Sequence, residues 1–260
     1  MENVIVTTVR KPNPNLEFSA EETAKKIGAN FFPRKDFSIE VLKNFSGAKN
    51  ILVAKKNSLV LLTEEGEFFF HPGTSHLRIK NLRSGLSDRL VDAAQIKPGD
   101  KILDCTLGPG SDAIVESFAA GESGKVIALE INPVIAEVVR SGMKNFSDDV
   151  PQILDAMRRV EVVTANYFDF LKSAGDKTFD AVYFDPMFIR PIEKSSGMNP
   201  IRSLASHELL SPEAVREACR VARRRVVMKS NAGSGEFERL GFKISPGGKY
   251  SSVAFGFIEV

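Results

Sequence analysis

The stretch DCTLGPGSDAI, residues 104–114, decides the fold expected for this chain of 260 residues. It ends an apolar run, Lys101–Cys105, that has the character of a buried strand, and it leads into a helix expected at Ser111–Ala120. Gly108 and Gly110 would let the backbone approach a ligand closely, next to the free amides that begin the helix. The pattern predicts a ligand loop of an α/β sheet. By itself it fits a dinucleotide loop about as well, and a glycine turn without a ligand is the less favoured alternative.

Outward from this loop, strands and helices alternate, which predicts a parallel sheet with helices on both faces. The expected strands are Lys101–Cys105, Lys125–Leu129, Val160–Val163, Ala181–Phe184 and Arg225–Lys229. The expected helices are Ser111–Ala120, Pro133–Asn145, Asp169–Ser173 and Pro212–Ala222. Two final strands, Phe242–Ser245 and Ser252–Glu259, flank a Pro-Gly-Gly turn and predict a hairpin. We therefore expect an α/β, Rossmann-like domain whose mostly parallel seven-stranded sheet ends in an antiparallel hairpin.

The region before this alternation predicts a small α+β domain. We expect it over residues 1–90, as a substrate-binding domain or a lid, with the main domain over residues 91–260. Its expected strands are Val4–Val9, Ser58–Thr63 and Glu67–Phe70, and its expected helices are Ala20–Ile27, Ile39–Phe45 and Leu86–Ala94. Ser19 and Ser38 are the predicted caps of the first two helices. The run Phe68–Phe70 is expected in the core of this domain.

Composition places few limits on function. Hydrophobic residues make up 43% of the chain, charged residues 26%, and the net charge is +2. No apolar run approaches the roughly 20 residues that span a bilayer, and no signal peptide is evident. Two cysteines without metal-type spacing indicate a reduced, cytoplasmic protein with no membrane and no metal partner. Basic residues of two clusters, Arg78 in the first and Arg190 and Lys194 in the second, could meet phosphates, although charge alone favours solvated helix faces.

Polar residues at the ends of the first three strands favour one cofactor. Glu130 ends the second strand, where a carboxylate accepts hydrogen bonds from both ribose hydroxyls, and Asn166 follows the third, where an amide could hold an adenine amine. Asp104 suits an ammonium group better than a diphosphate, and Asp112 would repel a pyrophosphate. These residues favour S-adenosylmethionine over a nicotinamide dinucleotide, although Asp112 would also stabilise the helix N-terminus without any ligand.

The fourth strand ends in DPMF, residues 185–188. An exocyclic amine of a base is a poor nucleophile because its lone pair is delocalised into the ring. Asp185 could accept one N–H and the Pro186 carbonyl the other, while Phe188 stacks on the base and fixes the line of attack. The alternative is a strand end with a proline turn and a buried phenylalanine. The position at the carboxyl edge of the sheet favours the first interpretation.

These motifs together resemble the bacterial small-subunit ribosomal RNA guanine-N2 methyltransferases. The resemblance rests on the loop TLGPGSDA at residues 106–113, on DPMF with its Met187, and on the Lys-x-Ser element that begins at Lys194. It implies S-adenosylmethionine as cofactor and ribosomal RNA as substrate. The cofactor contacts it implies are Ser111, Asp112, Glu130, Ile131, Ala165, Asn166 and Asp185. We also expect Asp104, Thr106, Gly108 and Gly110 to contact the cofactor. The substrate contacts we expect are Arg78, Met187, Arg190, Lys194 and Ser195.

Other functions stay open at this point. The acceptor could instead be adenine in DNA or a glutamine amide of a protein, since both present planar amino groups. The chain could also be an RNA-binding module without catalysis, and an NAD-dependent oxidoreductase is a more distant alternative. The segment from His71 to His76 is expected either to close over the cofactor or to form a surface turn. Cys105 is expected in the core. The oligomeric state is not determined by the sequence.

Overall fold

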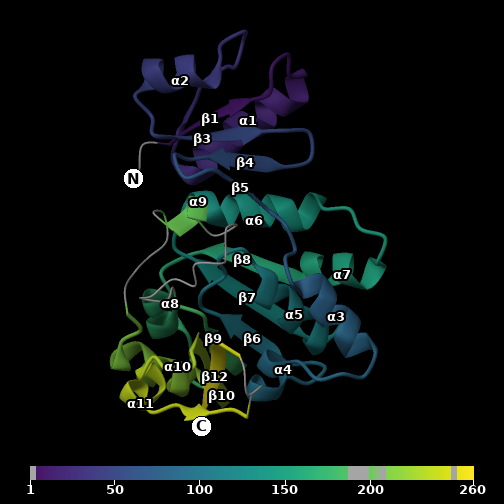
Figure 1. Cartoon of the computed structure of the whole chain (residues 1–260), viewed down its shortest axis with the longest axis vertical. Helices are drawn as coiled ribbons and strands as arrows, with labels where there is room; N and C mark the ends of the chain where they lie inside the picture. Colours follow the sequence, from purple (N-terminus) through teal and green to yellow (C-terminus); the bar gives the residue numbers. More distant parts are fainter. Residues whose placement is uncertain (1–3, 187–198, 203, 205–208, 247–250) are drawn as a thin grey trace. The chain divides into compact units, whose positions relative to one another are not determined.

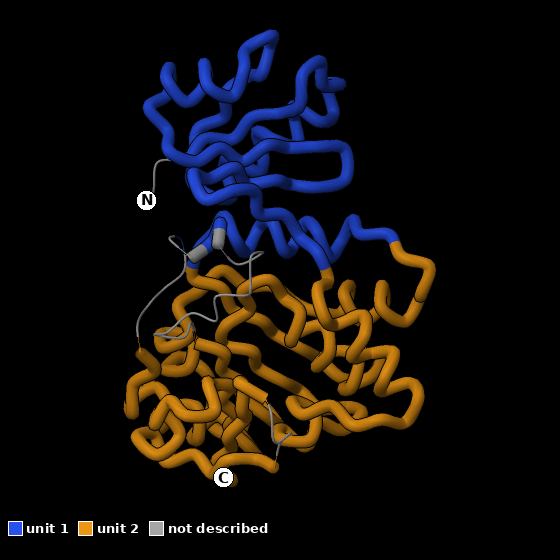
Figure 2. The backbone as a smooth tube through the Cα atoms, viewed as in Figure 1, with its two compact units in different colours: residues 1–71, 132–147, 193–205 blue, residues 72–131, 148–192, 206–260 orange. Residues whose placement is uncertain are grey.

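The computed structural model describes the whole chain except residues 1–3, 187–198, 203, 205–208 and 247–250. It contains two compact units (Figure 2). Unit 1 comprises residues 1–71, 132–147 and 193–205, and unit 2 comprises residues 72–131, 148–192 and 206–260. This partition differs from the division expected at residue 90, because residues 72–90 cluster with unit 2 and the helix at 133–145 with unit 1.

Unit 2 is built on a seven-stranded sheet with the order β11-β12-β10-β9-β6-β7-β8 (Figure 1). Its strands are β6 (Lys101–Asp104), β7 (Lys125–Glu130), β8 (Val160–Thr164), β9 (Phe179–Phe184), β10 (Ala222–Asn231), β11 (Lys243–Ile244) and β12 (Val253–Glu259). The first five are parallel, whereas β12 runs antiparallel to both β10 and β11. The predicted Rossmann-like sheet with a terminal antiparallel hairpin is therefore confirmed.

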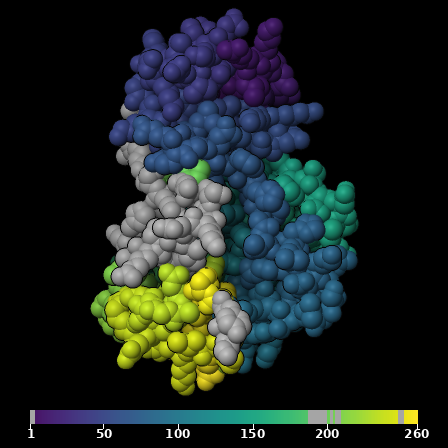
Figure 3. All heavy atoms as spheres, viewed as in Figure 1, coloured from purple at the N-terminus to yellow at the C-terminus, as the bar shows by residue number. Residues whose placement is uncertain are grey.

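Helices lie on both faces of this sheet, as a buried parallel sheet requires. They are α3 (Ser75–Arg83), α4 (Arg89–Ala94), α5 (Ser111–Ala120), α7 (Pro151–Arg159), α8 (Tyr167–Ser173), α10 (Pro212–Val221) and α11 (Glu236–Leu240). Val182 and Phe184 of β9 belong to the apolar core with α8, α10 and α11. Because side chains alternate along a strand, Tyr183 between them points to the opposite face, where its hydroxyl reaches α5. On that face α4 packs against β12, and Figure 3 shows the surface around these two segments.

Unit 1 holds a five-stranded mixed sheet with the order β2-β1-β3-β4-β5. Its elements are β1 (Val4–Thr8), α1 (Pro14–Ile27), β2 (Asn30–Phe31), α2 (Ile39–Ser46), β3 (Asn50–Ala54), β4 (Leu59–Leu62), β5 (Glu67–Phe69), α6 (Pro133–Asn145) and α9 (Asn199–Arg202). Strand β1 is parallel to both β2 and β3, and β4 is antiparallel to its two neighbours. The helix α6 approaches the sheet closely at Gly142, where an added Cβ would lie 2.1 Å from the Cβ of Phe70.

Several local predictions need correction. Helix α1 begins at Pro14 rather than at residue 20, because the side chain of Asn13, not Ser19, caps it by accepting from the Leu16 amide. Ser38 caps α2 as predicted. Strand β3 and helices α3 and α7 were not predicted. In the run Phe68–Phe70 the two outer side chains are buried, but Phe69 is 50% exposed. Among the described helices, none is long and apolar enough to cross a membrane.

Candidate active site

The glycine loop between β6 and α5 is tied to the end of the neighbouring strand β7. The Leu107 amide donates to the Leu129 carbonyl (2.8 Å), and the Gly108 amide donates to Glu130 Oε2 (3.2 Å). Gly108 and Gly110 have φ values of +50° and +85°. These values lie in the left-handed region, which glycine adopts without the steric cost of a Cβ. The loop therefore keeps a backbone conformation that other residues would strain, at the carboxyl edge of the sheet.

Asp104 is a buried carboxyl group with an unused oxygen. Its side chain has no exposed surface, and its Oδ1 accepts from the Thr106 amide at 2.9 Å. No hydrogen-bond partner for its Oδ2 is found among the described residues. Burial, reinforced by the nearby carboxylates of Asp112 and Asp185, raises the pKa of Asp104 to about 8. A cationic group beside this oxygen would satisfy it and favour its ionised form.

Strands β7 and β8 end beside the glycine loop, and the residues that follow them are both polar and apolar. The Ala165 amide donates to the Glu130 carbonyl at 3.0 Å, so the ends of β7 and β8 are joined. Ile131 is 45% exposed, which leaves an apolar surface next to Glu130. Asn166 Oδ1 caps α8 by accepting from the Phe168 and Asp169 amides. A contact of Asn166 with adenine therefore stays a prediction, and it would use the amide NH₂ group rather than this oxygen.

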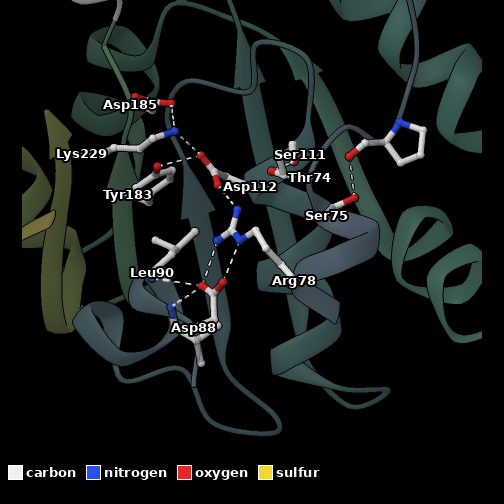
Figure 4. A network of polar contacts seen from close by, with 12 residues as sticks. Thr74, Ser75, Arg78, Asp88, Leu90, Ser111, Asp112, Tyr183, Asp185 and Lys229 are labelled. Atoms are coloured by element: carbon white, nitrogen blue, oxygen red, sulfur yellow. Dashed lines mark hydrogen bonds and ion pairs between the residues drawn. The ribbon is translucent and has the colours of Figure 1, made fainter. Parts of the chain in front are cut away.

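An ion-pair network fixes the first turn of α5 (Figure 4). Arg78 of α3 contacts Asp112 through Nη1 and forms a two-pronged pair with Asp88, with distances of 2.7 and 2.9 Å. Asp88 also caps α4 through the Leu90 amide. Burial by itself would lower the pKa of Arg78, but the two carboxylates outweigh it, so its guanidinium stays charged. The contacts observed for Arg78 are these two carboxylates, and its expected contact with substrate stays a prediction.

Lys229, near the end of β10, joins this network to Asp185 at the end of β9 (Figure 4). Its Nζ lies 3.0 Å from Asp112 Oδ2 and 2.6 Å from Asp185 Oδ2, and the Tyr183 hydroxyl donates to the same Asp112 oxygen at 2.9 Å. Burial alone would lower the pKa of Lys229, but the two carboxylates raise it above its usual range. The ammonium and Arg78 together overcome burial and hold the pKa of Asp112 below its usual range. For Asp185, burial dominates and raises the pKa despite Lys229.

Asp185 is also fixed through its main chain. Its backbone amide donates to Thr106 Oγ1 at 2.6 Å, and this hydrogen bond connects the end of β9 directly to the glycine loop. Pro186 follows at the same edge and is partly buried. The other expected site residues of this segment, Met187, Phe188, Arg190, Lys194 and Ser195, lie outside the described residues. Several sequence-predicted residues contact one another, directly or through Lys229: Arg78, Asp104, Thr106, Gly108, Asp112, Glu130, Ala165 and Asp185.

Lys229 is the functional residue that the sequence analysis missed. The strand Arg225–Lys229 was predicted, but its last residue was not assigned to the site. A lysine directly after the apolar run Val226–Met228, near the ligand edge of a parallel sheet, was the available signal. Ser111, which begins α5, lies 3.4 Å from Thr74 through their hydroxyl oxygens. Thr74 precedes α3, so the segment expected as a surface turn or a lid continues into a helix that is connected to the loop.

The residues present suit S-adenosylmethionine. Asp104 offers a buried carboxyl oxygen without a partner to an ammonium group, and Glu130 offers its carboxylate to ribose hydroxyls. The paired Asp112 leaves the helix N-terminus unsuited to a diphosphate. No group of three His, Cys, Asp or Glu side chains able to hold a metal ion occurs in the described part of the chain.

A family model described as "Putative SAM-dependent methyltransferase" matches residues 42–240. The chain belongs to this family. The uncharacterized protein YpiP of Bacillus subtilis (strain 168) is 37% identical over 241 residues, which are 92% of this chain and 93% of that protein. The ribosomal RNA small subunit methyltransferase J of Coxiella burnetii (strain RSA 493 / Nine Mile phase I) is 32% identical over 168 residues, which are 62% of each chain.

A solved structure agrees with the fold of this methyltransferase family. The SAM-dependent methyltransferase NGO1261 of Neisseria gonorrhoeae superposes with a TM-score of 0.60 and 15% identity, over 98% of this chain and 95% of that one. The family match over residues 42–240 identifies the chain as an S-adenosylmethionine-dependent methyltransferase, as the sequence predicted, with S-adenosylmethionine as its cofactor.

Proposed function

We propose that this methyltransferase modifies an exocyclic amino group of RNA, with guanine N2 of small-subunit ribosomal RNA as the acceptor. The observation that carries the proposal is the hydrogen bond from the Asp185 amide to Thr106 Oγ1, at 2.6 Å. It holds the Asp-Pro motif against the cofactor loop, where an amine bound by the motif would meet the methyl donor. The similarity to ribosomal RNA small subunit methyltransferase J supports RNA as the substrate class.

The proposed role of Asp185 is to accept an N–H of the amine through its carboxylate, while the Pro186 carbonyl accepts the second N–H. These two acceptors would draw the nitrogen toward a pyramidal shape and direct its lone pair at the methyl carbon. Lys229 supports this role because its ammonium, 2.6 Å from Asp185 Oδ2, favours the ionised carboxylate that burial disfavours. The other Asp185 oxygen then remains for the substrate.

The same carboxylate is suited to receive the proton that the reaction releases. When the amine nitrogen forms its bond to the methyl carbon, the bond from that carbon to the sulfonium sulfur would break and S-adenosylhomocysteine would leave. The nitrogen would become cationic, and one N–H proton must leave. The pKa of Asp185 is raised above its ordinary value, so its carboxylate is a better proton acceptor than an exposed aspartate. S-adenosylmethionine supplies a methyl group already activated by a sulfonium, so positioning and electrostatics are what the protein must add.

The remaining site residues are proposed to hold the cofactor and the RNA. Asp104 would bind the ammonium of the cofactor, Glu130 its ribose, and Ile131 with Ala165 and Asn166 its adenine. Thr106, Ser111 and the glycine loop would line the cofactor. Residues 187–195 would contact the base. The N-terminal region is proposed to bind the substrate, and a ribosomal substrate would place the protein in the cytoplasm.

A methyl-transfer assay tests this proposal. The protein would be incubated with labelled S-adenosylmethionine and, in parallel, with protein-free small-subunit ribosomal RNA, assembled small subunits and duplex DNA. Digestion to nucleosides and mass spectrometry should find N2-methylguanosine in one of the ribosomal samples and no label with the Asp185→Ala variant. Methyladenine in DNA, or label in ribosomal protein only, would contradict RNA as the acceptor while leaving the methyltransferase family unaffected.

A further inference from the structure

The sheet of unit 1 has its own carboxyl edge, formed by the three parallel strands β1, β2 and β3 (Figure 1). Thr8 pairs with Ala54, and the Val9 amide donates to the Ala54 carbonyl at 3.2 Å, so β1 and β3 end side by side. The Phe32 amide donates to the Val6 carbonyl at 2.8 Å, so β2 ends beside them. In open α/β sheets, ligands bind at the carboxyl ends of the parallel strands. They bind above all where the strand order reverses, so that the chain continues to opposite sides of one central strand.

Each of these strands is followed by two cationic residues. The six are Arg10 and Lys11 after β1, Arg34 and Lys35 after β2, and Lys55 and Lys56 after β3. Asp36 is the one acidic residue in the three loops, residues 9–13, 32–38 and 55–58. Five of the six cations are exposed, and Arg34 is half-buried. We call this group the basic edge of unit 1.

The cations of the basic edge have no acidic partners among the described residues. No ion pair or side-chain hydrogen bond of the six cations is found within the described ranges, whereas Lys25 and Lys26, at the end of α1, pair with Glu22 and Glu137. Arg34 Nε and Nη1 are shielded from solvent without a hydrogen-bond acceptor in the described part of the chain. Burial and the neighbouring Arg10 lower the pKa of Arg34. Six positive charges therefore lie along one edge of the sheet, and Arg34 keeps hydrogen-bond donors without an acceptor among the described residues.

The backbone presents these residues at some cost. Lys11 and Lys35 have φ values of +52° and +43°, in the left-handed region that residues with a Cβ adopt rarely. Such conformations persist where the surrounding structure imposes them, and they occur often at binding sites. Phe37 lies in the same loop as Arg34 and is 46% exposed. An exposed aromatic ring in the same loop as basic residues suits an unpaired base, which stacks on it while cations contact the phosphates.

We infer that the basic edge of unit 1 is a binding site for the phosphate backbone of the RNA substrate. This inference rests on the proposed function, since it assigns to unit 1 the contacts that hold the RNA whose base is modified in unit 2. An RNA chain supplies a row of phosphates, which match several cations placed along one edge, and unpaired bases, which match Phe37. The contacts are with phosphates, so they would hold RNA without reading its sequence.

A charge-matched pair of variants tests the inference. Arg10→Gln, Lys55→Gln and Lys56→Gln together remove three charges from the basic edge and leave the left-handed residues unchanged. The control, Lys25→Gln, Lys26→Gln and Lys49→Gln, removes three charges from unit 1 at the amino ends of β2 and β3. Binding of protein-free small-subunit ribosomal RNA would be measured by filter retention from 50 to 300 mM salt, beside binding of S-adenosylhomocysteine by calorimetry and thermal unfolding.

We expect the edge variant to bind the RNA at least about tenfold more weakly at 0.1 M salt, and its salt dependence to lose about two to three counterions. KM for RNA should rise with kcat unchanged at saturating RNA, while S-adenosylhomocysteine affinity and folding stay as in the wild type. Phe37→Ala should weaken binding of single-stranded RNA about fivefold or more with an unchanged salt slope. The control variant should retain wild-type affinity.

Two outcomes would overturn the inference. In the first, the wild type methylates RNA and the edge variant binds and methylates it equally well. In the second, the edge variant loses adsorption to vesicles that contain phosphatidylserine but keeps its RNA affinity, in which case the edge binds a membrane surface. If the wild type methylates no RNA at all, the proposed function fails instead, and this result is distinct because it does not depend on the variants.

Discussion

The two units of this methyltransferase each place charged residues at the carboxyl edge of parallel strands, but they treat these charges differently. In unit 2, Arg78, Asp112, Asp185 and Lys229 neutralise one another within a partly buried network. In unit 1, six cations remain exposed or half-buried without an acidic partner among the described residues. The first arrangement is preorganised for a small ligand and a defined geometry. The second is suited to a polyanion, whose own charges complete it.

The difference has an energetic consequence. In a partly buried network, removal of one charge leaves its partner desolvated and uncompensated, so fold and function depend on the same residues. Exposed cations are solvated in the free protein, so their loss should affect binding with little effect on folding. Four predictions test this contrast, from the largest expected effect to the smallest.

Asp185→Ala should decrease methyl transfer by about a thousandfold, because the acceptor amine loses the group that orients its lone pair and receives its proton. S-adenosylhomocysteine should still bind within a few-fold of the wild type, since the main chain at this position remains. Steady-state kinetics and calorimetry measure the two quantities. Asp176→Ala, which removes an exposed aspartate, is the control. Equal losses of cofactor binding and activity would indicate that Asp185 serves the cofactor rather than the acceptor.

Lys229→Met should lower the free energy of unfolding by about 2 kcal/mol at pH 7, because Asp185 loses its ammonium partner and Asp112 keeps Arg78 as its cationic partner. Burial already raises the folded-state pKa of Asp185 above its unfolded-state value, and loss of the ammonium would raise it further. The stability lost relative to the wild type should therefore increase as the pH rises from about 4 to 8. Asp112, whose pKa folding lowers in the wild type, contributes stability that is lost only below about pH 4, outside this range. Urea unfolding of the wild type and the variant between pH 5 and 8 measures this loss of stability. A loss that does not depend on pH would contradict the network.

Asp104→Asn should weaken S-adenosylhomocysteine binding by about tenfold at pH 7. With a pKa of about 8, Asp104 is mainly protonated at pH 7 in the free protein, and a bound ammonium would lower this pKa. The wild type should therefore release a proton from Asp104 on binding and bind more tightly as the pH rises toward 8. Calorimetry in two buffers of different ionisation enthalpy measures this proton. Its persistence in the Asn variant would assign the release to another group.

The smallest effect is expected for stability in unit 1. The variant with Arg10, Lys55 and Lys56 changed to glutamine should alter the free energy of unfolding by less than about 0.5 kcal/mol, since these side chains are exposed and unpaired. Urea unfolding of this variant and of Lys229→Met under the same conditions compares the two losses of stability directly. A loss as large as that of Lys229→Met would mean that the basic edge stabilises the fold and would remove the contrast between the two units.

Local patterns were enough to predict much of unit 2. The apolar strand before Asp104, the positive-φ glycines and the helix after them are specified within a few residues, and the alternation along the chain predicts the parallel sheet. Unit 1 was predicted less well. Strand β3, Asn50–Ala54, is a short apolar run without alternation, and such a run does not distinguish a strand from a helix segment. Helix α1 starts at an Asn-Pro signal, six residues before the predicted start at Ala20.

The sequence by itself therefore determined the fold class, the cofactor, and most of the acidic residues at the site, because turn chemistry and hydrophobic periodicity are short-range. The tertiary structure alone decided which charges meet. Lys229 and Asp112 are separated by 117 positions, and Lys229 and Asp185 by 44, so only the order β10-β9-β6 brings them together. The basic edge has the same origin, since its three loops become one surface only because β1 lies between β2 and β3.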